Sequence, residues 1–140
     1  MTTSDDNREL IRQFWDDLYR RDFEACGAYF APDGVYTDVP VGEQGATGPA
    51  EVAARLRLGL EPIERYEHHL RNLVADGDMV ITEHVEEWFW HTGEHVALPF
   101  VSVMELRGGQ IIRWWDYFNL PTLLDAAPQW WLEHIAPGYR

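Results

Sequence analysis

Hydrophobic residues follow two different periodicities along the chain, and the first half is dominated by helical spacing. In residues 8–21 they recur every three or four positions, which predicts an amphipathic helix. The same spacing predicts shorter helices over residues 23–30 and 49–60. Between them, Ala31-Pro32-Asp33-Gly34 is a strong turn signal, and the β-type run at residues 35–39 indicates a strand.

The second half of the chain has strand-like patterning. Four segments rich in β-branched and aromatic residues cover residues 64–74, 79–90, 96–106 and 110–119. Short turns join them, and connections of this length imply antiparallel neighbours. A last helix is expected over residues 122–135, broken at Pro128.

Helices followed by a meander of strands indicate an α+β fold. We expect a single domain over residues 1–140. One curved antiparallel or mixed sheet would wrap around the N-terminal helices and enclose a cone-shaped cavity.

The composition narrows the class of partner. A hydrophobic content of 46% with 14% aromatic residues is typical of a folded domain. A formal net charge of −13 disfavours nucleic acid and anionic membranes, because both need a basic face. The single cysteine, Cys26, excludes an intramolecular disulfide, and neither a signal peptide nor a membrane-spanning run is evident. These features predict a cytoplasmic protein.

The strand at residues 110–119 carries one acid on an otherwise apolar face. Because side chains alternate across a strand, Ile112, Trp114, Asp116 and Phe118 share that face. A buried carboxyl group is costly unless it is paired, hydrogen-bonded or protonated. Asp116 is therefore either tied to a backbone group at the strand end or projects into a pocket.

The strand at residues 79–90 has two mixed faces, and alternation alone does not decide which is buried. One face carries Thr82, His84, Glu86, Trp88 and Trp90; the other carries Ile81, Glu83, Val85, Glu87 and Phe89. If the first face is buried, His84 and Glu86 join Asp116 in a carboxylate–imidazole–carboxylate cluster. A histidine between two acids has its charged form favoured. Such a cluster suits acid–base chemistry, and the alternative is a buried ion-pair cluster without turnover.

Two further polar residues share a face on the strand at residues 35–39. Tyr36 and Asp38 are two positions apart, so a phenol and a third acid point the same way and could position a water near Glu86. Alternatively, Asp38 stabilises a turn before Pro40. No H-x-H or H-E-x-x-H spacing occurs, so neither a metal nor a cofactor is expected.

Large apolar side chains surround these candidate acids in the sequence. We expect them to wall a pocket for an apolar small molecule: Trp88, Trp90, Leu98, Phe100, Trp114 and Phe118. Trp130 and Trp131 in the last helix are available to cover that pocket or to fill it.

The order of elements and three motifs resemble the nuclear-transport-factor-2-like superfamily, which includes SnoaL-like polyketide cyclases and ketosteroid isomerases. The motifs are Tyr36-Thr37-Asp38, Thr82-Glu83-His84-Val85-Glu86 and the stretch from Gly109 to Asn119 that contains Trp115-Asp116-Tyr117-Phe118. They are most similar to those of the limonene-1,2-epoxide hydrolase branch, whose corresponding strand motifs read Y-x-N, T-E-R-V-D and G-x-I-x-x-W-R-D-Y-F-D.

The resemblance implies a role for each matching residue. Asp116 matches the acid that protonates the epoxide oxygen, and Glu86 matches the aspartate that activates water. His84 stands where the family has a bridging arginine, Tyr36 matches a tyrosine that helps to hold the water, and Asp38 replaces an asparagine. A homodimer that pairs through the outer face of the sheet is also implied.

The sequence thus predicts cofactor-independent acid–base hydrolysis of an epoxide of a terpenoid, polyketide or steroid-like compound. The alternatives are a SnoaL-like cyclase, a ketosteroid-isomerase-like isomerase, or a non-catalytic binding module.

Overall fold

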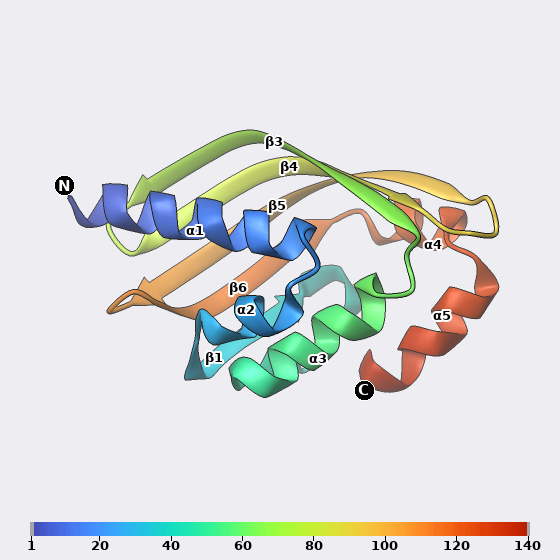
Figure 1. Ribbon diagram of the computed structural model, residues 1–140, viewed down its shortest axis with the longest axis horizontal. Helices are drawn as coiled ribbons and strands as arrows, with labels where there is room; N and C mark the ends of the chain where they lie inside the picture. The colour runs from blue at the N-terminus through green and yellow to red at the C-terminus, as the bar shows by residue number, and fades with distance from the viewer. Residues whose placement is uncertain (1, 140) are drawn as a thin grey trace.

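The structure, a computed structural model, describes residues 2–139 and confirms the predicted α+β fold. Six strands form one mixed sheet in the order β2-β1-β6-β5-β4-β3, which curls around the helices (Figure 1). The strands are β1 (Phe30–Asp38), β2 (Ala46–Thr47), β3 (Arg65–Asp76), β4 (Met79–Phe89), β5 (His95–Arg107) and β6 (Gln110–Phe118). The helices are α1 (Thr3–Tyr19), α2 (Phe23–Ala28), α3 (Gly48–Leu60), α4 (Leu120–Ala126) and α5 (Gln129–Ile135), with the short 3₁₀ turns η1 (Val39–Val41) and η2 (Ala136–Tyr139).

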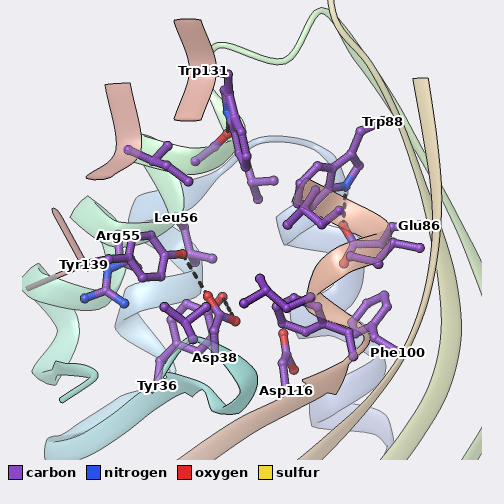
Figure 2. Close-up of a pocket in the computed structure, with 18 of the residues that line it drawn as sticks. Tyr36, Asp38, Arg55, Leu56, Glu86, Trp88, Phe100, Asp116, Trp131 and Tyr139 are labelled. Carbon is purple, nitrogen blue, oxygen red and sulfur yellow. Dashed lines mark hydrogen bonds between the residues drawn. The ribbon is translucent and has the colours of Figure 1, made fainter. Parts of the chain in front are cut away.

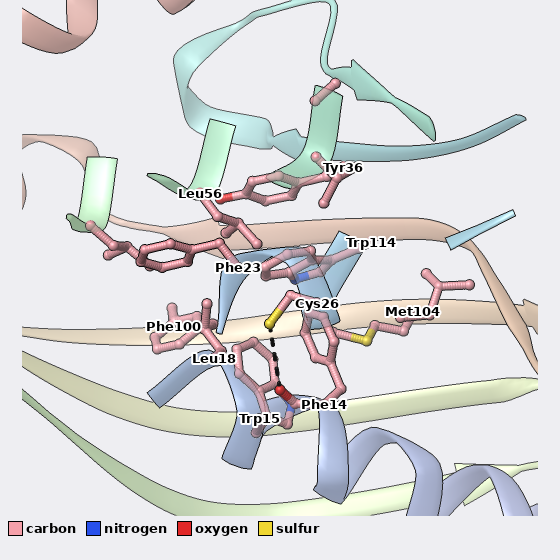
Figure 3. Packing of buried hydrophobic residues seen from close by; sticks show 14 of the residues in the cluster. Phe14, Trp15, Leu18, Phe23, Cys26, Tyr36, Leu56, Phe100, Met104 and Trp114 are labelled. Carbon is pink, nitrogen blue, oxygen red and sulfur yellow. Dashed lines mark hydrogen bonds between the residues drawn. The ribbon is translucent and has the colours of Figure 1, made fainter. Parts of the chain in front are cut away.

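Helix α1 begins five residues before the predicted start because Thr2 caps it. The Thr2 hydroxyl accepts a hydrogen bond from the Asp5 backbone N–H, and the Asp5 carboxylate accepts one in return, which satisfies two otherwise free donors. The helix then buries Phe14 and Trp15 in an aromatic core with Phe100 and Trp114 of the sheet (Figure 3).

The predicted turn at Ala31-Pro32-Asp33-Gly34 lies inside strand β1. Pairing with β6 is interrupted between Phe30 and Val35 and then resumes. Proline has no N–H to donate, so these four residues disturb the pairing without ending the strand.

A second irregularity changes which residues of β6 lie on its inner face, so the prediction for Ile112 was wrong. The register with β5 shifts between Glu105 and Leu106, so that Ile111 is fully buried while Ile112 is only half-buried. The predicted alternation holds from Trp114 onward, because the bulge lies before that residue.

The strand pairing follows two patterns. Strands β3 to β6 form the predicted antiparallel meander, with β5 between β4 and β6. Strand β1 instead pairs parallel to β6, which is distant in sequence. Helices α4 and α5 separate at Pro128, as predicted, and close the end of the sheet away from the N-terminus (Figure 1). Within residues 2–139, no helix combines the length and apolar character needed to cross a membrane.

Candidate active site

The strand register places the candidate polar residues side by side on the inner face of the sheet. Asp38 of β1 lies opposite Asp116 of β6, Asp116 lies opposite Ser102 of β5, and Ser102 lies opposite Thr82 of β4. Glu86 lies four residues after Thr82 on the same face of β4, opposite Leu98. The mixed strand at residues 79–90 therefore buries the face that carries the imidazole and the carboxyl group.

A cavity of about 320 Å³ lies between this face and the helices (Figure 2). Asp38, Glu86 and Asp116 line it together. The aromatic and aliphatic sheet residues of the wall are Trp88, Leu98, Phe100, Trp114 and Phe118. Helices α3, α4 and α5 contribute Leu56, Leu60, Leu123, Trp131 and Ile135. Three carboxyl groups thus line a cavity whose walls are otherwise largely apolar.

Asp116 is held as a buried acid. Its Oδ1 accepts hydrogen bonds from Ser102 Oγ at 2.5 Å and from Trp114 Nε1 at 2.6 Å. Burial raises the pKa of Asp116 well above its usual value, and the nearby Asp38 and Glu86 raise it further. These surroundings favour the protonated form of the Asp116 carboxyl group.

The pKa of Glu86 is also raised by burial, to a value near neutral pH. Its Oε2 accepts a hydrogen bond from Trp88 Nε1 at 2.7 Å (Figure 2). Burial raises the pKa of Glu86 to about 7, opposed by Trp88 and by the nearby Tyr19 phenol. Tyr19 does not line the cavity. Near neutral pH, Glu86 is therefore available as a base.

Asp38 accepts hydrogen bonds from two phenols, one close to it in the sequence and one near the C-terminus. Tyr36 Oη donates to Oδ1 at 2.9 Å, and Tyr139 Oη donates to Oδ2 at 2.8 Å (Figure 2). Burial raises the pKa of Asp38, while both phenols and Arg55 lower it. The Tyr36 hydroxyl hydrogen is used in the hydrogen bond to Asp38. That Tyr36 also helps to hold a water near Glu86 stays a prediction.

His84 does not form the expected direct bridge between the two carboxyl groups. Its Nδ1 lies 2.7 Å from His68 Nε2, and its Nε2 lies 3.0 Å from Ser102 Oγ. Burial lowers the pKa of His84 to about 2, so the ring is neutral rather than cationic. The imidazole is shorter than the arginine of the resembling family, so it reaches Asp116 only through Ser102.

Trp90 also lies elsewhere than predicted. Strand β4 ends at Phe89, and Trp90 packs edge-on against Trp88 and Trp131, with ring centroids 6.0 and 5.4 Å away. It supports the wall from behind and does not line the cavity. Trp131 does line the cavity, whereas Trp130 donates its indole N–H to Thr92.

The sequence interpretation missed two residues that contact the acids. Ser102 had a detectable signal: it is the one hydroxyl among the apolar alternate residues of its strand, and it is fully buried. Tyr139 had none, because it reaches Asp38 across 101 residues of chain.

Metal-ligand types also come together outside the cavity. Glu67, His69 and Glu87 are within reach of a shared ion on the outer face of the sheet. That the cavity works without a metal or cofactor stays a prediction.

The family can be assigned from a comparison of the sequence with family models. The model described as a SnoaL-like domain matches residues 11–114. The chain belongs to this SnoaL-like family. A comparison with curated proteins found no match.

Solved structures share the SnoaL-like fold. An LEH-like epoxide hydrolase from M. tuberculosis has a TM-score of 0.73 and 24% identity, covering 87% of this chain and 89% of that chain. A proposed SnoaL-like polyketide cyclase from Jannaschia has a TM-score of 0.81 and 18% identity, covering 91% and 96%. A proposed ketosteroid isomerase from Kribbella flavida has a TM-score of 0.69 and 24% identity, covering 85% and 82%. These identities show the fold alone.

Proposed function

We propose that this SnoaL-like protein hydrolyses the epoxide of a small to medium apolar compound by general acid–base catalysis. The observation that carries the proposal is that Glu86 and Asp116 line one apolar cavity with different hydrogen-bond partners. Burial raises the pKa of Glu86 to about 7, and burial with two neighbouring acids raises the pKa of Asp116 well above its usual value. An acid that ionises near neutral pH can serve as the base, and one whose surroundings favour the protonated form can serve as the acid.

The chemistry is a single step without a covalent intermediate. Glu86 takes a proton from a water molecule as the water oxygen attacks one epoxide carbon. The carbon–oxygen bond breaks, and Asp116 gives its proton to the departing oxygen, which leaves a vicinal diol. The Asp116 proton fits this role because Oδ1 already accepts two hydrogen bonds, which leaves Oδ2 as the protonated oxygen.

The cavity supports an apolar substrate. Its walls are aromatic and aliphatic, and its volume of about 320 Å³ is near the lower end of ligand pockets. Two of its lining residues, Val41 and Leu124, are exposed and mark the mouth of the cavity. A terpenoid-sized or cyclic alkene epoxide fits these requirements.

A second candidate function uses Asp38. This carboxyl group lines the same cavity and is oriented by the Tyr36 and Tyr139 hydroxyls. A base held in this way suits proton abstraction from carbon, as in an isomerase or cyclase. That reaction would depend on Asp38 rather than on Glu86.

The test is incubation with a panel of terpene and cycloalkene epoxides in oxygen-18 water. Under single-turnover conditions we expect a diol that carries one heavy oxygen, because water attacks directly. Glu86→Gln and Asp116→Asn should each lower the rate at least about a hundredfold. Glu87→Gln is the matched control, because Glu87 is the next residue and points to the outer face.

Three other outcomes would contradict the proposal. An unlabelled diol in the first turnover would mean that a protein carboxylate attacks the epoxide. Activity that is lost in Asp38→Asn but kept in Glu86→Gln would favour the isomerase or cyclase. Ligand uptake without turnover, by folded protein, would indicate a binding module.

A further inference from the structure

One side of the cavity carries a second group of polar side chains, in addition to Glu86 and Asp116. Asp38, Arg55 and Tyr139 line the cavity there, and they come from β1, α3 and η2. Figure 2 shows these three side chains together, at a distance from Glu86. The rest of the wall is largely apolar, so this group marks a place where a ligand could form hydrogen bonds.

Arg55 is held in place by contacts that leave some of its donors free. Its guanidinium forms an ion pair with Glu43, which does not line the cavity. The guanidinium carbon also lies over the Tyr139 ring, 4.2 Å from the ring centroid. A guanidinium has five N–H donors, and the bond to Glu43 uses one of them. Donors therefore remain that a ligand in the cavity can use.

Asp38 offers acceptors beside these donors. Each of its carboxylate oxygens accepts one hydrogen bond from a phenol, Tyr36 at 2.9 Å and Tyr139 at 2.8 Å. A carboxylate has about four acceptor positions, so roughly two remain. Tyr139 brings the two charged groups together, because its ring lies under Arg55 while its hydroxyl binds Asp38.

A structural role alone explains this arrangement poorly. The contacts attach η2 to α3 and β1, but a buried ion pair adds little stability once the cost of desolvation is counted. If attachment were the only role, Arg55 and Asp38 would be expected to pair directly. Among the residues that the structure describes, Arg55 pairs with Glu43 instead, and Asp38 pairs with the two phenols.

The acceptor and the donors together select one kind of polar group on a ligand. A hydroxyl group can donate to Asp38 and accept from Arg55, so it satisfies both. A carbonyl has nothing to donate to Asp38, an ammonium has nothing to accept from Arg55, and a carboxylate is disfavoured by the three carboxyl groups of the cavity. We propose that Asp38 and Arg55 form a subsite for a hydroxyl group that the substrate carries in addition to its epoxide. This proposal rests on the proposed hydrolysis for the identity of the reacting group.

The strand register sets the spacing between the hydroxyl group and the epoxide. Asp38 lies directly opposite Asp116 on neighbouring strands, and both side chains line the cavity. Neighbouring strands are about 4.8 Å apart, so the two substrate oxygens should be separated by about 5 Å. An extended epoxy alcohol with one methylene group between the carbinol carbon and the epoxide ring has about this separation.

The kinetic test compares two such epoxides with the same carbon skeleton, one with the hydroxyl group and one with a methyl group in its place. In the wild type we expect kcat/KM to be at least about tenfold higher for the hydroxyl compound, because the methyl compound leaves the polar groups of the subsite unpaired. The difference should lie mainly in KM, since the hydroxyl group contacts the subsite both before and during the reaction. Equal kcat/KM values for the two compounds would overturn the subsite.

The decisive variant replaces Arg55 together with its partner. Combining Arg55→Met with Glu43→Gln leaves neither charge of the buried pair without its partner. The preference for the hydroxyl compound should then fall to less than about twofold. Glu43→Gln alone is the matched control and should keep the preference, because Arg55 stays at the cavity wall. A double variant that is folded by circular dichroism and keeps the wild-type preference would overturn the subsite.

A second variant covers the case in which the double variant does not fold. Tyr139→Phe keeps the ring under Arg55 and removes only the hydroxyl that orients Asp38. Its preference for the hydroxyl compound should be lower than that of the wild type. An unchanged preference in Tyr139→Phe would overturn the proposed arrangement.

Equilibrium binding separates this proposal from the hydrolysis. Tryptophan fluorescence can report binding of both epoxides, because Trp88, Trp114 and Trp131 line the cavity. It is measured in the wild type, or in Asp116→Asn if the wild type turns the epoxides over. A Kd at least about tenfold lower for the hydroxyl compound, with no diol formed, would refute the hydrolase and leave the subsite. Diol formation with equal Kd and equal kcat/KM for both compounds would keep the hydrolase and overturn the subsite.

Discussion

At the scale of single residues, three carboxyl groups with the same chemistry differ because their neighbours differ. Asp38 accepts from two phenols, Glu86 from one indole, and Asp116 from one indole and one hydroxyl. All three are buried, so each resists becoming an anion. Neighbouring acids add to this resistance at two of the three groups: Asp38 raises the pKa of Glu86, and both Asp38 and Glu86 raise the pKa of Asp116. At Asp38 the two phenols and Arg55 act in the opposite direction and lower the pKa.

The proposed roles of Glu86 and Asp116 predict a bell-shaped dependence of kcat/KM on pH. Glu86 must be ionised to act as a base, so activity should rise as pH rises through about 7. Asp116 must be protonated to act as an acid, so activity should fall again at higher pH, where its raised pKa is passed. Initial rates between pH 5 and 10 test this. Activity that is constant across pH 6–8 would contradict the assignment of Glu86 as the base.

Ionisation of Glu86, which the proposed reaction needs, should lower the stability of the folded protein. The pKa of Glu86 is raised from 4.5 to about 7 on folding, so the folded state binds this proton more tightly than the unfolded state. The wild type should therefore lose stability, relative to Glu86→Gln, as pH rises from about 4.5 to about 7. We expect the variant to be more stable at pH 8 by on the order of 3 kcal/mol, and close to wild type at pH 4.5. Urea unfolding at both pH values measures this difference. A variant that is less stable than wild type at pH 8 would contradict the raised pKa of Glu86.

At the scale of elements, α5 acts as a wall of the cavity. Trp131 donates its indole N–H to the Gly59 carbonyl oxygen of α3 at 2.9 Å and packs against Trp88. It is 2% exposed, whereas its neighbour Trp130 is half-buried on the other side of the helix. The short helix is therefore anchored to both α3 and the sheet through one side chain.

We predict that Trp131→Ala destabilises the protein by about 3–5 kcal/mol, because it removes a buried indole and leaves a void. The enlarged cavity should also bind small epoxides more weakly, which raises KM. Trp130→Ala is the control and should cost much less in both measurements. Thermal unfolding and KM for one small epoxide test this, and equal effects of the two substitutions would refute the role of α5.

Patterning predicted the elements well but not the exact pairing within them. Strict alternation placed Trp114, Asp116 and Phe118 on one face, and in the structure all three residues of β6 line the cavity. The same alternation gave Ile112 instead of Ile111, because a bulge depends on the partner strand and not on local sequence. The turn residues before Val35 similarly became an irregular stretch of β1 once β6 lay beside them.

At the scale of the whole molecule, the outer face of the sheet carries an apolar row. Val74, Ile81, Val103 and Trp115 lie opposite one another across β3, β4, β5 and β6. Val74 is 58% exposed and Ile81 is 39% exposed. An apolar row of this length on a sheet surface suits contact with another protein surface. That this contact is a second copy of the chain stays a prediction.

We predict that the protein forms a homodimer through this apolar row, and light scattering should report the mass of a dimer. Ile81→Arg should convert the dimer to a folded monomer, because the Ile81 side chain is exposed and its replacement does not disturb the core. Val41→Arg is the control, because Val41 is 36% exposed at the mouth of the cavity, away from the outer face. A monomeric wild type, or a dimer unaffected by Ile81→Arg, would contradict this prediction.

The sequence by itself determined which residues could be buried together. Periodicity gave the α+β order, and a single acid on an apolar face indicated Asp116, because a polar residue in such a position is visible without any neighbour. Glu86 lay on one of two mixed faces of its strand, and alternation left open which of them is buried. Only the tertiary structure decided what those acids touch. The parallel pairing of β1 with β6, the contact of Tyr139 with Asp38 and the position of Ser102 between His84 and Asp116 all join residues far apart in the chain. The protonation of an acid is set by such neighbours, so His84 was expected to be cationic and is held neutral by burial.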